Sequence, residues 1–210
     1  NFTRVVEESP KDLTPFGLNT PSLKIILSMN NGETKGVRVG DDHPMGNKVY
    51  LARLNASRVL TAGITKNRLD QEVHDLRDKT ILDFETSKIT KIELIRNGKT
   101  LSLKKDEESW EVSEKKITAK GNESEITNLL NTIQTARIEQ FVEEQPEQLA
   151  AYGLNNSKLT VKLTTSQENE PLTLLIGKKS EHGFYAKTPL KGNIFVINQS
   201  LFDTLSNREL

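Results

Sequence analysis

The sequence contains no cysteine, few aromatic residues and no long apolar run. Without cysteine, the chain can form no disulfide, thiolate metal site or cysteine nucleophile. Phe, Trp and Tyr make up only 5% of the 210 residues, so the rings are expected mainly in the core. No stretch of consecutive apolar residues approaches the ~18 residues that a membrane-spanning helix requires.

An excess of charge of one sign is also missing. The 29 Lys and Arg residues balance the 29 Asp and Glu residues, so the formal net charge is zero. A nucleic-acid partner is therefore not expected, because such proteins carry clustered positive charge. The chain is long enough for one large or two small folded domains.

An internal repeat organises the sequence. The stretch Arg4–Leu27 returns 136 positions later as Gln140–Leu163, and 10 of the 24 aligned residues are identical without a gap. The identical residues of the first copy are Val6, Glu7, Glu8, Pro10, Leu13, Gly17, Leu18, Asn19, Leu23 and Leu27. Repeats of this kind indicate one structural unit used more than once.

The similarity continues beyond these stretches. An apolar segment ending in glycine recurs (Val37–Gly40 and Leu174–Gly177), followed each time by an aromatic, strand-like segment. Residues 76–139 have no counterpart within the chain. We therefore expect a motif half (residues 1–75) that ends a first repeat unit, and a complete second unit (76–210) made of a spacer half (76–139) and a motif half (140–210). This order also leads us to expect that a further spacer half precedes the chain in a longer protein.

Local patterns predict the secondary structure of the motif halves. Short helical turns are expected at Pro10–Phe16 and Pro146–Tyr152, each ended by the glycine that follows. Alternating apolar residues predict strands over Leu23–Ser28 and Leu159–Thr165. We expect Arg4–Leu69 and Gln140–Leu205 to form the same βαβ-rich unit.

The spacer half has its own pattern. Ile89–Arg96, Thr100–Lys105 and Trp110–Val112 are expected as an antiparallel meander, with a hairpin turn at Asn97-Gly98. Ser124–Arg137 is expected as a helix, because its apolar residues recur at i, i+3, i+4 and i+7. The fold class predicted for the whole chain is α+β with mainly antiparallel sheets.

The residues shared by the two copies are interpreted as structural. Gly17 and Gly153 are expected to end their turns with positive φ, and the aromatic residue before each is expected to anchor the turn. The structural motif consists of Leu13, Phe16, Gly17, Leu18 and Asn19 in the first copy and Leu149, Tyr152, Gly153, Leu154 and Asn155 in the second.

Two loops carry the candidate ligand-binding residues. Asp41, Asp42 and His43 lie in one loop, and His182 has a similar place in the other, so a cation site is an option. Three adjacent residues cannot all face one ion, however, and Gly, Pro, Asp and His together are typical of a solvated turn. We therefore predict no metal site and no cofactor, and keep these four residues as weak metal-ligand candidates.

No catalytic constellation is visible in the sequence. Neighbouring acidic residues such as Glu7-Glu8 and Glu143-Glu144 would point to opposite faces of a strand, unlike the facing carboxylates of a glycosidase. Nucleophile-elbow, phosphate-loop and zinc-helix motifs are all missing. We therefore do not expect an enzyme.

The motifs resemble a bacterial family known as domain of unknown function 4340. The resemblance is carried by the paired L-x-x-[FY]-G-L-N motifs, the apolar segments ending in glycine and the segment Leu76–Phe84. It continues in the order of Trp110, a helix and the apolar strand Ile138–Val142. The resemblance implies an extracytoplasmic domain, commonly behind a membrane anchor and often encoded beside gliding-type ABC transporter components. It implies no catalytic residues.

We therefore expect a non-catalytic, periplasmic or cell-surface module that binds a protein partner, such as a membrane transporter or envelope component. Contact with the membrane is expected only through an anchor outside this sequence. The alternative is a glycan- or peptide-binding module that uses the loops Asp41–Asn47 and Lys178–Gly183.

Overall fold

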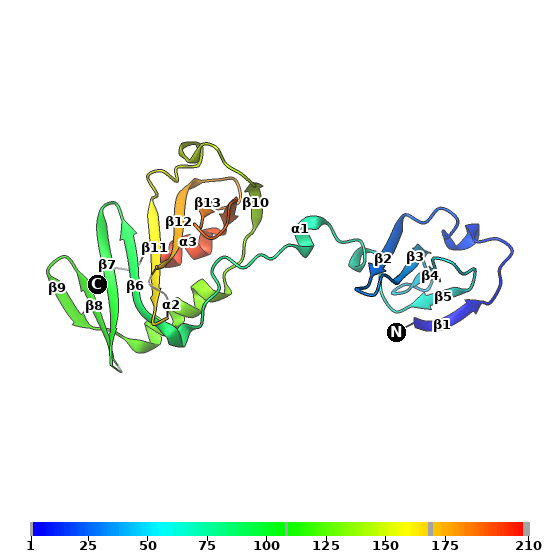
Figure 1. The fold of residues 1–210 in the computed structure, drawn as a ribbon, viewed down its shortest axis with the longest axis horizontal. Coiled ribbons are helices and arrows are strands. Elements are labelled where there is room, and N and C mark those ends of the chain that lie inside the picture. The colour runs from blue at the N-terminus through cyan, green and yellow to red at the C-terminus, as the bar shows by residue number, and fades with distance from the viewer. Residues whose placement is uncertain (1, 108, 168–169, 208–210) are drawn as a thin grey trace. The chain divides into compact units, whose positions relative to one another are not determined.

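The computed structural model describes residues 2–107, 109–167 and 170–207, which form two compact units, residues 1–76 and 77–210. Both units are built on antiparallel sheets with short helices (Figure 1), so the predicted α+β class is confirmed. No helix in the described ranges is long and apolar enough to cross a membrane.

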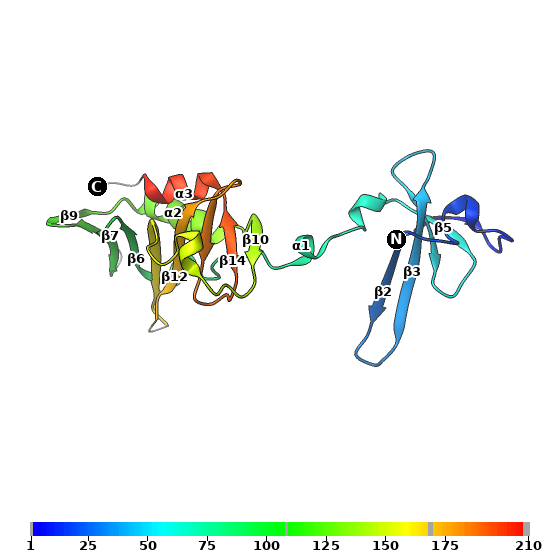
Figure 2. The same cartoon turned by 90° about the horizontal axis from the view of Figure 1, so that it is seen from above.

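The first unit is a five-stranded sheet in the order β1-β5-β4-β3-β2. Its strands are β1 (Phe2–Glu7), β2 (Leu23–Ser28), β3 (Thr34–Asp42), β4 (Val49–Arg53) and β5 (Val59–Ala62). The connecting helical turns are the 3-10 turns η1 (Thr14–Phe16) and η2 (Lys66–Arg68) and the short helix α1 (Val73–Leu76). The hairpin of β2 and β3 extends well beyond the other strands (Figure 2).

The second unit is a nine-stranded sheet in the order β10-β14-β13-β12-β11-β6-β7-β8-β9. The spacer half supplies η3 (Thr86–Lys88), β6 (Ile89–Arg96), β7 (Lys99–Asp106), β8 (Ser109–Glu114), β9 (Ile117–Lys120) and α2 (Glu123–Thr135). The motif half supplies β10 (Gln140–Glu143), η4 (Leu149–Tyr152), β11 (Leu159–Thr165), β12 (Leu172–Lys179), β13 (Phe184–Lys187), β14 (Ile194–Ile197) and α3 (Gln199–Ser206).

The two motif halves share one topology. The order β10-β14-β13-β12-β11 repeats β1-β5-β4-β3-β2, and η4 takes the place of η1. The repeat is thus confirmed, but the expected βαβ character is wrong. The first and second strands of each half lie at opposite ends of an antiparallel meander, and the segment between them forms a single 3-10 turn. The halves differ after their last strand, where the first forms the 3-10 turn η2 and the second forms α3.

The cores of the two units differ in size. In the second unit, α2 and α3 lie on one face of the sheet (Figure 2), and their apolar residues join those of the strands in one large cluster. The first unit has two small clusters, one on each face of its sheet. They are built around Leu18, Ala52 and Val59 and around Val39, Val49 and Ala62.

Candidate functional site

The shared motif forms the same turn in both units. Gly17 (φ 65°, ψ 20°) and Gly153 (φ 69°, ψ 23°) adopt the left-handed conformation and end their 3-10 turns. The following leucines, Leu18 and Leu154, are buried, and each donates its backbone N–H to the carbonyl of the leucine that opens the motif, at 3.1 Å in both copies. The interpretation of these glycines as turn-ending residues agrees with this geometry.

Each turn packs against the strand segment that ends in glycine. A Cβ atom on Gly40 would stand 2.0 Å from the carbonyl oxygen of Phe16, and one on Gly177 would stand 2.2 Å from that of Tyr152. The backbone of the turn therefore lies directly on the backbone of β3 or β12, which only glycine permits. The sequence showed that this glycine recurs, but its contact joins segments that are distant along the chain.

The motif aromatics pair with the tyrosines of the aromatic strands. The rings of Phe16 and Tyr50 meet edge to face at 5.1 Å, and those of Tyr152 and Tyr185 do so at 5.0 Å. Tyr152 also donates its hydroxyl proton to Glu143 at 2.7 Å, and this hydrogen bond raises the pKa of Tyr152. These aromatic residues are half-buried and form a structural anchor for the turn.

Polar side chains brace the first copy further. Asn19 donates to Asp12 at 3.2 Å and to the hydroxyl of Thr14 at 2.8 Å. Hydrogen bonds from the side chain and backbone of Thr14 lower the pKa of Asp12. Asn155, at the equivalent position of the second copy, is exposed.

Arg38 is an anchoring residue that the sequence pattern did not single out. Its guanidinium group donates to the carbonyl of Leu18 at 3.2 Å and to that of Ala56 at 2.6 Å, tying the motif turn to the loop before β5. Leu175 of β12 takes this position in the second unit. Alternation along an isolated strand cannot show which of its charged residues turns inward.

Of the weak metal-ligand candidates, Asp41 and Asp42 lie at the end of β3 and not in the loop predicted for them, whereas His43 and His182 lie outside the strands. The Nδ1 atom of His43 accepts the backbone N–H of Met45 at 3.1 Å, and Asp41 lies exposed beside Gly17. Asp42 is exposed, and His182 is exposed in a turn within the second unit, so the structure does not gather the four residues at one site. In the described part of the chain, no group of three or more His, Asp or Glu residues could hold a metal ion.

A charged cluster joins the two halves of the second unit. Arg77 forms two hydrogen bonds with the carboxylate of Glu144, at 2.5 and 3.1 Å, and stacks over Phe141 at 3.4 Å. Nearby, Lys191 pairs with Asp78 at 3.3 Å. The backbone N–H and hydroxyl of Thr80, followed by Lys191, lower the pKa of Asp78 to about 2. Every charge named here has an opposite partner, as expected of a structural network.

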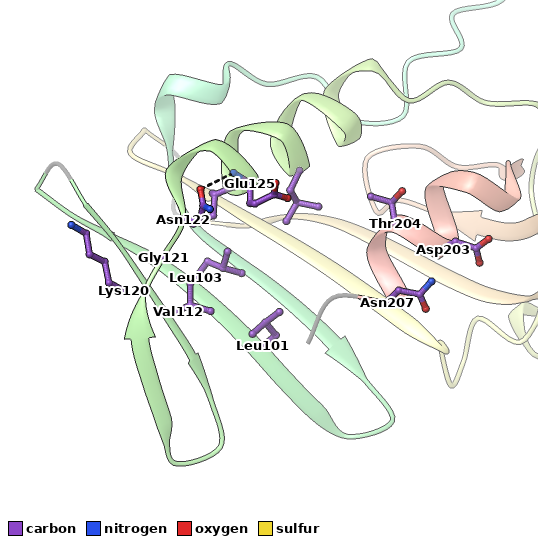
Figure 3. Close-up of a pocket in the computed structure, with 12 residues that line it drawn as sticks. Leu101, Leu103, Val112, Lys120, Gly121, Asn122, Glu125, Asp203, Thr204 and Asn207 are labelled. Carbon is purple, nitrogen blue, oxygen red and sulfur yellow. Dashed lines mark hydrogen bonds between the residues drawn. The ribbon is translucent and has the colours of Figure 1, made fainter. Parts of the chain in front are cut away.

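An open cleft of about 720 Å³ lies beside the spacer meander of the second unit (Figure 3). Its floor is apolar and is formed by Leu101, Leu103 and Val112. Residues at the start of α2 and the end of α3 form its polar sides; among them are Asn122, Glu125, Asp203, Thr204 and Asn207. Asn122 and Asp203 are already used within their own helices, the first as the cap of α2 and the second as the acceptor of Gln199. The cleft therefore suits an apolar group better than a reacting one.

Comparison with protein families agrees with the repeat. A family model described as a domain of unknown function, DUF4340, matches residues 1–144 and matches again over residues 116–210. The chain belongs to the DUF4340 family. The two matches together span the whole sequence, so the predicted resemblance is confirmed. No curated protein and no solved structure matches this DUF4340 chain.

Proposed function

We propose that this DUF4340 chain is a non-catalytic repeat module that binds another protein outside the cytoplasm, as an accessory to an ABC-type transporter or envelope assembly. One comparison between the two motif halves carries the proposal. The residues that build the turn recur in both copies, whereas the strand ends beside the turn carry opposite charges, Asp41-Asp42 at the end of β3 and Lys178-Lys179 at the end of β12. A repeated reaction centre would need the same chemical groups in both copies, whereas a repeated scaffold needs only the same packing.

The place and class of the partner rest on the family resemblance. The protein-binding role is supported by exposed apolar residues on the second unit. Ile117 on the edge strand β9 is 62% exposed, and Leu190 in the loop before β14 is 70% exposed. Unpaired strand edges and exposed apolar side chains are common elements of protein interfaces.

Site-directed photo-crosslinking tests this role in the full-length protein within its own membrane. A photoreactive residue replaces Ile117 or Leu190, with matched variants at Met45 and His182 in the two candidate ligand loops. We expect Ile117 or Leu190 to crosslink to one transporter or envelope protein and the loop positions to give none. If all four positions give no crosslinked protein, the proposal is wrong.

The glycan- or peptide-binding alternative is tested separately. The cleft beside the spacer meander is lined by residues outside both loops, so this alternative concerns binding at the surface of the loops. A glycan array probed with the original chain and with a variant carrying alanine throughout both loops decides it. Binding that disappears in the loop variant would favour this alternative over protein binding.

A further inference from the structure

The first unit exposes an apolar face that is buried in the second. Leu23, Ile25 and Leu27 of β2 align with Leu159, Val161 and Leu163 of β11 under the 136-residue shift. The three β11 residues are at most 1% exposed, whereas Leu23 and Ile25 are half-buried and Leu27 is 63% exposed. We name Leu23, Ile25, Leu27 and the adjacent Val37 of β3 the open face.

The second unit shows what covers the equivalent residues. Strand β6 of the spacer half pairs antiparallel with β11 along its whole length, placing Leu94 opposite Val161 and Ile92 opposite Leu163. Helix α2 then packs its apolar stripe into the same core cluster. The equivalent residues are thus covered by a strand that pairs with β11, by the meander that this strand begins and by an amphipathic helix.

Neither element has a counterpart on the first sheet in the described part of the chain. That sheet ends at β2, so the outer backbone groups of this strand have no strand partner there. A hollow of about 670 Å³ lies beside the β2–β3 hairpin and the segment that follows β4, lined by residues that include Ile25, Leu27 and Val37. On the same face, Ile64 and Leu69 pack with Leu23 and Ile25 against the small cluster around Val39 and Val49, whereas Leu27 is not part of that cluster.

We propose that the open face and the β2 edge dock a polypeptide element with the pattern of the chain's own spacer half. Its strand pairs antiparallel with β2, and its helix covers Leu23, Ile25 and Leu27. The edge supplies unpaired N–H and C=O groups to the strand, and burial of Leu27 and of the remaining accessible surface of Leu23 and Ile25 stabilises the complex. This inference does not depend on the transporter association.

A chimaera tests the proposal with the second unit's own spacer half as the probe. A copy of residues 76–139 is joined in front of Arg4 in place of residues 1–3, because the repeat aligns Glu139 with Thr3. Hydrogen exchange of the β2 amides and thermal unfolding are compared with those of the original chain. Leu27→Asp is the disabling variant, and Met45→Asp, at a residue 83% exposed in a loop of the same unit, is the matched control.

We expect the β2 amides of the chimaera to exchange at least about tenfold more slowly, because strand pairing protects them. The first unit should also unfold at a higher temperature. Leu27→Asp should remove both effects, and Met45→Asp should retain them. Unchanged exchange at β2 would overturn the proposal, whether the added copy remains unfolded or folds elsewhere.

Sedimentation of the original chain tests a different occupant. If the chain forms a dimer that Leu27→Asp disrupts and Met45→Asp does not, the open face binds a second copy and the proposal is wrong. If the chain sediments as a monomer at all concentrations, the open face does not bind a second copy, which agrees with the proposal. The chimaera comparison and the sedimentation experiment both use purified protein. Their outcome therefore does not depend on whether the chain crosslinks to a transporter.

Discussion

At the scale of single residues, glycines have two separate roles in this protein. Gly17 and Gly153 provide a positive φ at the end of a turn. Gly40 and Gly177 have no such conformation, but they allow one backbone to lie on another. The distinction matters because the first role costs a substituted residue conformational strain, whereas the second produces a collision with atoms that cannot rotate away.

Gly177→Ala should therefore destabilise the second unit strongly. The new Cβ would stand 2.2 Å from the Tyr152 carbonyl oxygen, so the turn must move away from β12. We expect a loss of about 1–3 kcal/mol or more in the free energy of unfolding, measured by denaturant titration. The control is Gly98→Ala, where φ is +75° but no heavy atom of the described residues, apart from those of Gly98 and its two chain neighbours, lies within 4 Å of the new Cβ. There the loss should be about 1 kcal/mol, and equal losses at both positions would contradict the collision.

Asp78 should show a pH dependence with a definite sign. Its pKa is lowered from 3.8 to about 2, chiefly by hydrogen bonds from Thr80. A lowered pKa in the folded state means that the charged form stabilises folding above pH 3.8, and that this contribution disappears as the pH falls through about 2. An NMR titration of the carboxyl carbon checks the value. In Lys191→Met the pKa should stay well below 3.8, because Lys191 is only a secondary cause; a return to 3.8 would show that the ion pair dominates.

At the scale of elements, the ends of α2 are set by local chemistry. The Asn122 side chain accepts the backbone N–H groups of Ser124 and Glu125, at 3.1 and 3.3 Å, so the helix begins at Glu123. Ala136 is extended (φ −60°, ψ 144°) and ends the helix two residues before the predicted Arg137. The apolar stripe predicted the buried face of this helix correctly: Ile126, Leu129, Leu130 and Ile133 are all buried.

Asn122→Ala should lower the stability of the second unit by about 1 kcal/mol, because two backbone donors at the start of α2 lose their acceptor. Asn122→Asp is the matched control and should be nearly neutral, since a carboxylate can accept the same hydrogen bonds and favours the helix N-terminus. Thermal unfolding monitored by circular dichroism measures both variants. A loss as large in the aspartate variant would mean that the cap contributes through some other contact.

At the scale of the whole molecule, the two units should unfold in separate transitions, because each contains core clusters of its own. Leu129→Ala in the large cluster should cost about 2–5 kcal/mol and lower only the transition of the second unit. Val49→Ala removes fewer buried methyl groups and should lower only the transition of the first unit by a smaller amount. Calorimetry distinguishes the two, and a single transition shifted by both variants would contradict independent units.

The sequence by itself determined the repeat, the fold class and most of the local elements. Strand alternation placed Leu23–Ser28 and Leu159–Thr165 as the structure has them, and the glycine after each aromatic residue indicated where the turns end. These features depend on side-chain periodicity and on backbone conformation, which act between residues close along the chain.

Only the tertiary structure decided which of these elements contact one another. The contact of Gly177 with Tyr152, the inward turn of Arg38 and the pairing of β6 with β11 join residues far apart in sequence. Leu27 and Leu163 occupy matching positions of the repeat, yet one is exposed and the other is buried. Both leucines have the same preference for burial in the local sequence pattern. Only Leu163 is buried, because the fold brings a strand and a helix into contact with it.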